Sequence, residues 1–531
     1  MKNIHTKWIC LMTVLCLLMG LVLGCGGSPA KSATEPEQTA DNTEPAQSAA
    51  TDEQVKDETS AKAPPEGTPP EGMGQPPAGE RPEGTPPEGM GKPPAGERPE
   101  GAPHGGMGKP PSGGPGGGPG GPGGSSADID YSGAVEITSA DSQTGQTYST
   151  DTVDQSALLI ATSEAVAIAD PSVTKSGSSD GGDSCNFYGL NAAVLAKDGA
   201  NVTITGGTIT SDASGANGIF CYGGNGGKNG AAGDGTTVTV RDTVITTTGS
   251  GSGGIMTTGG GVTYAYDLTV TTSGQSSAPI RTDRGGGTVY VDGGTYTSNG
   301  LGSPTIYSTA EIHVANATLV SNLSEGVCIE GKNSIELTNC DMTANNTKMN
   351  SNAGFLDTIM IYQSMSGDAD SGTSAFTMTG GTLTSKNGHV FHVTNTSAVI
   401  TLSGVTIVNE DSAGVLLSVC DDGWSGAGNT AVLNAKGQTL EGSLLVGSNA
   451  TLTLNLIDGS AFTGAVSGEI TNAKGTAVST EAGTVHVSLD ASSTWTLTAD
   501  TYVTSFTGDA SRVIANGHTL YVNGVALTGT K

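Results

Sequence analysis

The chain has 531 residues, of which 83 are glycine and only 4 % are aromatic, and this composition excludes an ordinary globular enzyme. Its formal charge of −29 excludes a nucleic-acid partner, because neutralising phosphates takes clustered lysine and arginine and the sequence has no basic patch. No stretch has the periodicity and caps of an amphipathic helix of three or more turns, so we predict that the folded part is all-β.

Residues 1–24 are predicted to be a targeting segment. Two lysines precede an apolar run, Trp8 to Leu23, that is too short and too early for a membrane span. The run ends in Val22-Leu23-Gly24-Cys25, which resembles the lipobox of bacterial lipoproteins. This resemblance implies cleavage before Cys25, acylation of that cysteine, export, and attachment to the membrane at a bacterial cell surface. The alternative is an ordinary secretory signal with a chance cysteine.

Residues 25–126 are predicted to be a disordered stalk. The segment has no aromatic and almost no large aliphatic residue, so burial cannot offset the loss of chain entropy on folding. A 17-residue repeat beginning PEGTPPEGMG starts at Pro65 and Pro82 and returns in degraded form at Pro99. Proline extends such a chain and glycine loosens it. We interpret the segment as a spacer that carries the folded part away from the membrane.

The folded part begins near residue 127 and is built from an irregular repeat. The copy NVTITGGTITSDASGANGIFCYGG from Asn201 contains two short alternating strands, a paired-glycine turn and a third strand. Variants of this pattern recur at intervals of about 22 to 30 residues, which is typical of a solenoid. We predict a solenoid over 127–428, further coils with longer and plainer strands over 429–531, and a terminal cap formed by Trp495 and the strands after it.

Strands with apolar residues inward and polar residues outward, separated by Asn/Gly corners, resemble the right-handed parallel β-helix of the pectate-lyase-like superfamily and of bacterial surface adhesins. One repeat could not bury its apolar face alone, whereas stacked repeats share a continuous core. The resemblance implies three strands per turn, spaced about 4.8 Å apart, and 15 to 18 turns would give a rod roughly 70 to 85 Å long. The tight catalytic signatures of pectate lyases and polygalacturonases do not occur in the sequence.

The third strand of each repeat differs from the other two, whose outward residues are mostly threonine and serine. When its aliphatic residues are placed inward, its outward side collects a large share of the aromatic and charged residues of the chain. Such groups suit a sugar polymer, and the families resembled here bind polysaccharide along one parallel sheet. We therefore predict a ligand-binding surface, the outer stripe, made of Phe220, Tyr222, Arg281, Asp283, Arg284, Tyr307, Glu330, Lys332, Tyr362, His392, Asp422 and Trp424.

Three functions stay open for the outer stripe. The first is an adhesin-like module that binds a polysaccharide or a glycan of a host or neighbouring cell. The second is a polysaccharide lyase or a glycoside hydrolase. The resemblance implies Arg281 or Lys332 as the base of a lyase, with Asp283 and Glu330 holding Ca²⁺, while a hydrolase would use the same two carboxylates as its acid and base. The third is a passive scaffold without a ligand.

The remaining candidates for chemistry carry weaker patterns. His389 and His392 do not predict a metal site, because no third ligand follows at the spacing such sites need. Five cysteines follow Cys25, and we interpret them as small buried residues. A bridge between Cys328 and Cys340 is the alternative. No cofactor is predicted, and Ca²⁺ binding is left open.

Overall fold

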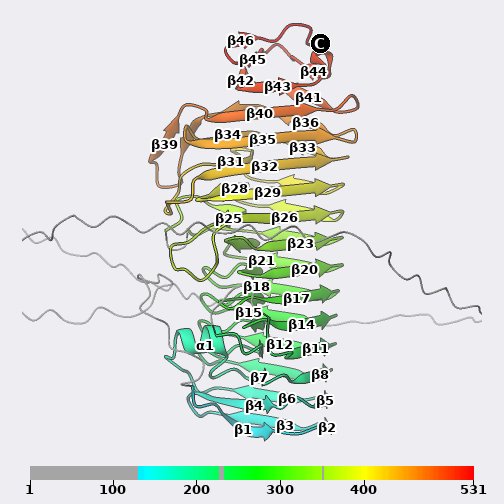
Figure 1. The fold of residues 1–531 in the computed structure, drawn as a ribbon, viewed down its shortest axis with the longest axis vertical. Helices are drawn as coiled ribbons and strands as arrows, with labels where there is room; N and C mark the ends of the chain where they lie inside the picture. The colour runs from blue at the N-terminus through cyan, green and yellow to red at the C-terminus, as the bar shows by residue number, and fades with distance from the viewer. Residues whose placement is uncertain (1–128, 227–231, 350–351) are drawn as a thin grey trace, which may run out of the picture. The chain divides into compact units, whose positions relative to one another are not determined.

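A computed structural model describes residues 129–226, 232–349 and 352–531. The predicted signal peptide, the predicted lipidation site Cys25 and the predicted stalk lie outside these residues. Within them, short parallel strands are stacked one above another from β1 to β44, with three strands in each turn of the chain (Figure 1). The predicted fold class, an all-β right-handed parallel β-helix, is confirmed. Among the described residues, no helix is long and apolar enough to cross a membrane.

Three faces run along the β-helix. Sheet A contains 13 parallel strands: β1 (Ser132–Ile137), β4 (Gln155–Ala161), β7 (Val194–Lys197), β10 (Ile219–Tyr222), β13 (Ile255–Thr258), β16 (Ile280–Thr282), β19 (Ile306–Ser308), β22 (Val327–Glu330), β25 (Asp357–Tyr362), β28 (His389–Thr394), β31 (Val415–Val419), β34 (Ser443–Val446) and β37 (Val466–Ser467).

Sheet B is the longest face and contains 14 parallel strands: β2 (Asp141–Thr144), β5 (Ala165–Ala169), β8 (Asn201–Thr205), β11 (Thr237–Arg241), β14 (Gly261–Tyr266), β17 (Gly287–Asp292), β20 (Glu311–Ala315), β23 (Ser334–Thr338), β26 (Thr373–Thr379), β29 (Thr396–Ser403), β32 (Asn429–Lys436), β35 (Ala450–Ile457), β40 (Thr484–Leu489) and β43 (Ser505–Thr507). Sheets A and B both continue without a break past residue 429, where the character of the sequence changes.

The third face is divided into two sheets. Sheet C contains β3 (Thr147–Thr150), β6 (Ser172–Lys175), β9 (Thr208–Ser211), β12 (Val244–Thr247), β15 (Thr269–Thr272), β18 (Thr295–Ser298), β21 (Thr318–Ser321), β24 (Asp341–Ala344), β27 (Thr382–Ser385) and β30 (Thr406–Asn409). Sheet D contains β33 (Thr439–Glu441), β36 (Ala461–Gly464), β41 (Thr494–Leu497) and β44 (Val513–Ile514).

The β-helix has about fourteen coils, one for each strand of sheet B. At about 4.8 Å per step the stack is roughly 60 Å long. The expected 15 to 18 turns were therefore too many. That expectation assigned too many residues to the coils, because long connections leave the coil, such as the 18 residues between the end of β6 at Lys175 and the start of β7 at Val194.

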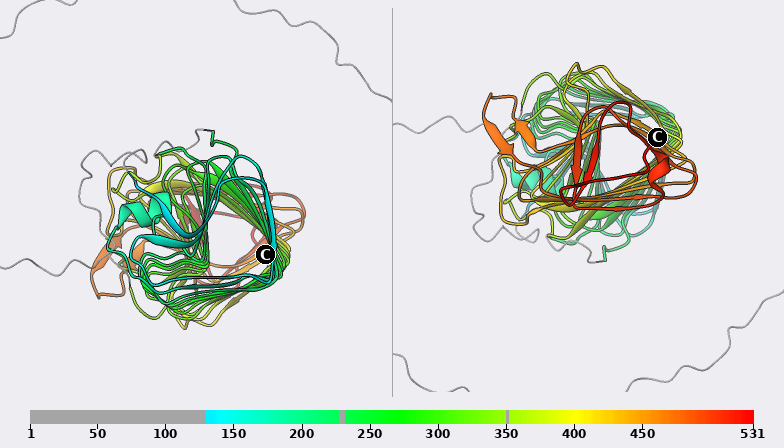
Figure 2. Two further views of the ribbon diagram at one scale, coloured as in Figure 1. Left: turned by 90° about the horizontal axis from the view of Figure 1, so that it is seen from below. Right: turned by 90° about the horizontal axis from the view of Figure 1, so that it is seen from above.

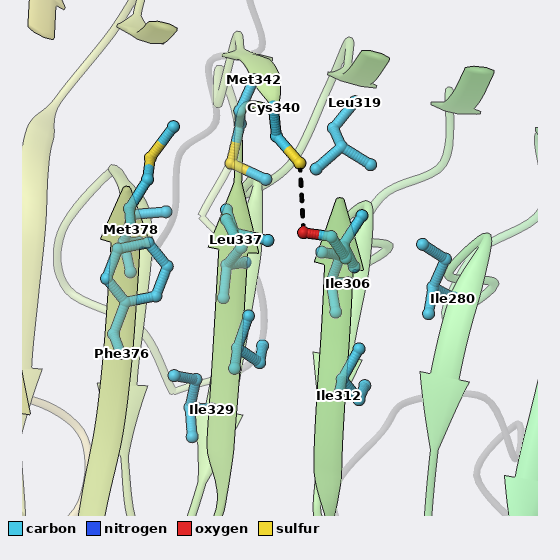
Figure 3. Packing of buried hydrophobic residues seen from close by; sticks show 14 of the residues in the cluster. Ile280, Ile306, Ile312, Leu319, Ile329, Leu337, Cys340, Met342, Phe376 and Met378 are labelled. Atoms are coloured by element: carbon cyan, nitrogen blue, oxygen red, sulfur yellow. Dashed lines mark hydrogen bonds between the residues drawn. The ribbon is translucent and has the colours of Figure 1, made fainter. Parts of the chain in front are cut away.

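Inward-facing aliphatic residues form ladders along each face, and these ladders make one core. Figure 3 shows Ile280, Ile306 and Ile329 from sheet A facing Leu337 and Phe376 from sheet B. Each of these five residues is fully buried, because the two-residue period of a strand points every second side chain into the interior. The thiol of Cys340 lies in this core and donates a hydrogen bond of 3.4 Å to the carbonyl oxygen of Val314.

The corner between sheets B and C explains the Gly, Asn and Asp residues that punctuate the repeats. Asp242, Gly293 and Asn316 occupy this corner in different coils, and all have a positive φ between 51° and 77°. Only glycine adopts this region without strain, and the short polar side chains of Asn and Asp tolerate it best among the others. At Gly207 a side chain is excluded by contact as well, because a Cβ would lie 2.2 Å from the carbonyl oxygen of Pro171.

Several connections fold back over the outer side of sheet A. They include α1 (Asp183–Tyr188), the one α-helix in the described part of the chain, and the antiparallel hairpin of β38 (Glu469–Thr471) and β39 (Ala477–Thr480). Both views along the axis in Figure 2 place α1 and this hairpin on the same side of the coil. Sheet A is thus covered by a second layer along part of its length.

The C-terminal cap begins after the predicted position. Trp495 is fully buried in β41 of sheet D, with its ring centroid 5.7 Å from that of Phe462, so it belongs to the coil core. The strands that close the end are β42 (Thr501–Val503), β45 (Leu520–Val522) and β46 (Val525–Ala526), joined through the short 3₁₀ helix η2 (Ala510–Arg512). The pair β45–β46 is antiparallel, which departs from the stacking of the coils and ends it.

Candidate functional site

The outer stripe lies on the outer side of sheet A, as the alternation predicted. In β10, Ile219 and Cys221 belong to the coil core, whereas Phe220 and Tyr222 belong to a separate cluster outside it. The register of sheet A aligns outward residues of successive coils, so that Phe220 pairs with Met256 and then Arg281. Phe220 and Arg281 therefore lie in one outward column of sheet A.

The N-terminal part of the outer stripe is covered by α1. Phe220 is completely buried and Tyr222 is 3 % exposed, because Phe187 and Tyr188 of the helix pack over them. The rings of Tyr188 and Tyr222 meet edge to face at 5.8 Å, and the hydroxyl of Thr258 donates a 2.7 Å hydrogen bond to the carbonyl oxygen of Phe187. These two stripe residues anchor the helix to the sheet.

The charged residues at the centre of the outer stripe pair with one another and with a covering segment. Arg281 donates to Asp283 at 2.6 Å, and the backbone N–H of Arg284 donates to the same carboxylate at 2.9 Å. The guanidinium of Arg284 pairs with Asp368 and lies 4.2 Å from the centre of the Phe187 ring. Burial raises the pKa of Asp283 to about 6, although the charge of Arg281 opposes that shift.

Glu330 is the most heavily hydrogen-bonded residue of the outer stripe. One carboxylate oxygen accepts from the hydroxyls of Tyr307 and Tyr362, at 2.6 and 3.1 Å. The other accepts from Ser364 and, at 3.3 Å, from Ser366, both in the segment 363–372. Burial, followed by the Glu330 charge, raises the pKa of both tyrosines well above its usual value. A carboxylate held by four hydroxyls fastens this segment over the sheet.

Two histidines and an aspartate form a second buried network nearer the C-terminus. The hydroxyl of Ser418 lies 2.7 Å from Nδ1 of both His389 and His392. On the far side of its ring, Nε2 of His392 lies 3.3 Å from Asp422, which also accepts from the backbone N–H of Gly354 at 2.6 Å. Burial and, to a smaller extent, the neighbouring His392 together lower the pKa of His389 to about 3, so that His389 is neutral.

The other two stripe residues differ in exposure. Trp424 is 9 % exposed and its ring lies 5.0 Å from that of Tyr362, as part of the covering layer. Lys332 is exposed and pairs with Asp370 at 3.2 Å. Of the twelve residues it is the one that is exposed, while six are buried and five are partly buried, so most of the outer stripe is covered. Its role as a ligand surface or as the site of a lyase or hydrolase stays a prediction.

The structure also locates the candidates for metal binding and disulfide formation. In the described ranges, no three His, Cys, Asp or Glu side chains are grouped so that they could hold a metal ion. The five cysteines described are all free and buried. Cys340 lies in the coil core and Cys328 lies outside it against Met360, so the alternative of a bridge between Cys328 and Cys340 is wrong.

Sheet B carries an open aromatic surface that the sequence analysis missed. Tyr264, Tyr290 and His313 occupy the same outward position in β14, β17 and β20. The rings of Tyr264 and Tyr290 are nearly parallel at 5.2 Å, and those of Tyr290 and His313 are nearly parallel at 5.0 Å. Tyr290 is 40 % exposed. Side chains that stack on one another in this way form a preorganised surface.

This aromatic stack forms one wall of a shallow groove of about 420 Å³, here called the tyrosine groove. The second outward column of the same strands forms its other side, where Tyr266 and Asp292 are followed by the smaller Ala315 and Thr338. Four successive strands contribute, so the groove runs along the axis of the β-helix for roughly 14 Å. A straight groove of this kind suits an elongated ligand.

Acidic side chains surround the tyrosine groove. Glu336 continues the aromatic column and contacts Nδ1 of His313 at 3.1 Å, while Glu311 contacts Nε2 of the same ring at 2.9 Å. Asp292 accepts a 2.7 Å hydrogen bond from the side chain of Asn316. At one end, the guanidinium of Arg241 lies 3.7 Å from the centre of the Tyr266 ring. The groove therefore combines ring surface with fixed hydrogen-bond acceptors.

The signal for this groove was present in the sequence. The segments VTYAYD, TVYVDG and EIHVAN each place an aromatic or imidazole ring at the outward position of the first strand of a repeat, where other repeats have threonine. In the same column Thr203 and Thr239 precede Tyr264, and Thr377 and Thr401 follow Glu336. A comparison of outward positions in all three strands of every repeat would have found the stack.

The geometry and the fold define this protein as a parallel β-helix with a covered face and an aromatic groove on another face. Comparison of the chain with protein-family models, with curated proteins and with solved structures found no match. Function is therefore inferred from the residues of this chain.

Proposed function

We propose that this chain is an exported lipoprotein of the bacterial cell surface, held to the membrane through Cys25, whose β-helix is an adhesin-like module that binds saccharide in the tyrosine groove. The resemblances of residues 22–25 to a lipobox and of the repeats to pectate-lyase-like β-helices support the anchor and the class of ligand. The polysaccharide-binding surface was first expected on the outer stripe, and we now place it on sheet B.

The observation that carries this proposal is the exposed stack of Tyr264, Tyr290 and His313 beside fixed carboxylates. Sugar rings have apolar C–H faces and many hydroxyl groups, so a site for them needs aromatic surface and hydrogen-bond acceptors together. Tyr290 and Tyr502 are the two aromatic residues among the exposed large apolar side chains of the described ranges. Of these two, Tyr290 lies in a groove that acidic residues surround.

The proposal is tested by applying the labelled full chain to a glycan array, with Ca²⁺ and with a chelator, and then sizing the bound glycans. We expect binding to a defined set of glycans that survives the chelator and leaves their length unchanged. Loss of that binding in Tyr290→Thr, but not in Tyr502→Thr, would assign it to the tyrosine groove. Shortened glycans would favour the lyase or hydrolase, and no binding to any glycan would leave a passive scaffold.

A further inference from the structure

The charges around the tyrosine groove restrict which saccharide it can take, if the proposed function holds. None of the described residues that line the groove is a lysine or an arginine, whereas Asp292 and Glu336 both line it. A carboxylate only accepts hydrogen bonds, so it gains most from a ligand that brings N–H or O–H donors and a positive charge. We propose that the tyrosine groove selects amine-bearing sugars, such as polymers of glucosamine, and rejects polymers of uronic acids.

Asp292 is the residue that makes this selection. It lies in the second column of the groove, directly after Val291, in the same strand as the exposed Tyr290. Its only hydrogen-bond donor among the described contacts is the amide of Asn316, which is neutral, so its negative charge is not compensated by a cation there. An ammonium group of a sugar that packs against Tyr290 would supply that cation.

The other charged groups near the groove do not cancel this preference. Glu311 and Glu336 both contact the ring of His313. Even with a positive charge on His313, these three side chains would together keep one net negative charge. Arg241 occupies the same column two strands before Asp292, and its guanidinium lies over the ring of Tyr266 on the strand between them. The formal charge of the whole chain is −29, which adds a long-range repulsion of polyanions.

An acidic polymer is disfavoured for the same physical reason. A uronate carboxylate placed beside Asp292 would put two like charges together, and like charges across an interface oppose binding. This distinguishes the tyrosine groove from a site for pectate, which needs cations or basic side chains to hold the acid groups of the polymer. The β-helix fold alone would not have made this distinction.

The experiment is calorimetric titration of the full chain with three tetramers of equal length, made of glucosamine, N-acetylglucosamine and galacturonic acid, at low salt and pH 6. We expect the glucosamine tetramer to bind about two- to fivefold more tightly than the neutral tetramer, as an exposed ion pair allows. We expect the galacturonic acid tetramer to bind most weakly. In Asp292→Asn, whose side-chain oxygen can still accept from Asn316, the ratio of the affinities for the glucosamine and N-acetylglucosamine tetramers should fall towards one. Asp341→Asn, an exposed aspartate on sheet C, is the matched control for the change in net charge and should behave as wild type.

The outcomes separate this inference from the proposed function. Equal binding of the neutral and amine-bearing tetramers to wild type would overturn the amine preference and leave the saccharide site intact. Tighter binding of the galacturonic acid tetramer would overturn it as well. If no tetramer binds but the array shows binding to other glycans, the amine preference fails and the saccharide site stands, whereas no binding in either assay overturns both proposals. A lysine tetrapeptide is the last arm, and if it binds wild type and Tyr290→Thr as tightly as the glucosamine tetramer binds wild type, the site is a general cation site and the inference is wrong.

Discussion

The sharpest test of the tyrosine groove is the change Tyr290→Thr. Tyr290 is 40 % exposed, and an aromatic side chain presents roughly 200 Å², so about 80 Å² of this ring is open to a ligand. At about 25 cal/mol per Å² its full coverage contributes about 2 kcal/mol, or about 30-fold in Kd. Half coverage contributes about 1 kcal/mol, or about fivefold. We therefore expect a five- to thirtyfold loss of affinity.

Threonine is the appropriate replacement because it occupies the same column in other coils, for example at Thr239 and Thr377. The strand should consequently keep its conformation and its pairing with β14 and β20. Calorimetric titration with the tightest ligand from the array measures the loss, and a thermal melt checks the fold. Unchanged affinity in a variant that melts like wild type would refute the reasoning, because no ligand could then be packing on this ring.

The remaining predictions concern the buried residues. Phe376→Ala removes a fully buried core ring and should lower the free energy of unfolding by about 3 to 5 kcal/mol. The control Val408→Ala, at a position that is 38 % exposed, should change it by about 0.5 kcal/mol or less. Equal losses for the two variants in denaturant melts would contradict the core assignment. Lys175 is buried with its ammonium donating to the carbonyl oxygen of Thr152 at 2.9 Å, and burial lowers its pKa from 10.5 to about 8. Between pH 8 and 10.5 the unfolded chain therefore binds more protons than the folded chain. As the pH rises through this window, wild type should gain roughly 3 kcal/mol of folding free energy relative to Lys175→Met. Parallel profiles of stability against pH for the two proteins would rule this out. Thiol labelling followed by peptide mapping should modify the five buried cysteines only after denaturation, because burial raises their pKa; they are Cys185, Cys221, Cys328, Cys340 and Cys420. Labelling of Cys328 or Cys420 in the native state would show that the covering layer opens, whereas labelling of Cys221 or Cys340 would show that the coil core opens.

The covered state of sheet A changes how its polar residues are understood. The groups that suggested catalysis, Asp283 and Glu330, are each engaged by neighbours: one by Arg281 and a backbone N–H, the other by four hydroxyls. Buried polar groups need such partners, because an unpaired one costs a large part of its hydration energy. In the described structure these residues fasten the second layer to the sheet.

The class of fold and the direction of the strand side chains could be predicted from the amino-acid sequence. The two-residue period of each strand and the Gly, Asn and Asp corners are local properties, so they predicted the strands, the parallel β-helix and the outward placement of Phe220, Arg281 and Glu330. The number of coils was overestimated, because chain length does not tell how many residues leave the coil.

Which outward residues are exposed to solvent depends on the tertiary structure. Residues 183–188 and 363–372 follow strands in the sequence, but only their folding back onto sheet A buries the outer stripe. Tertiary structure also creates the tyrosine groove, here by bringing exposed side chains together. Tyr264 and Tyr290 are 26 positions apart, and they stack because parallel register brings equivalent positions of successive coils to within one strand spacing. A surface of this kind is a property of the stack, and no single repeat contains it.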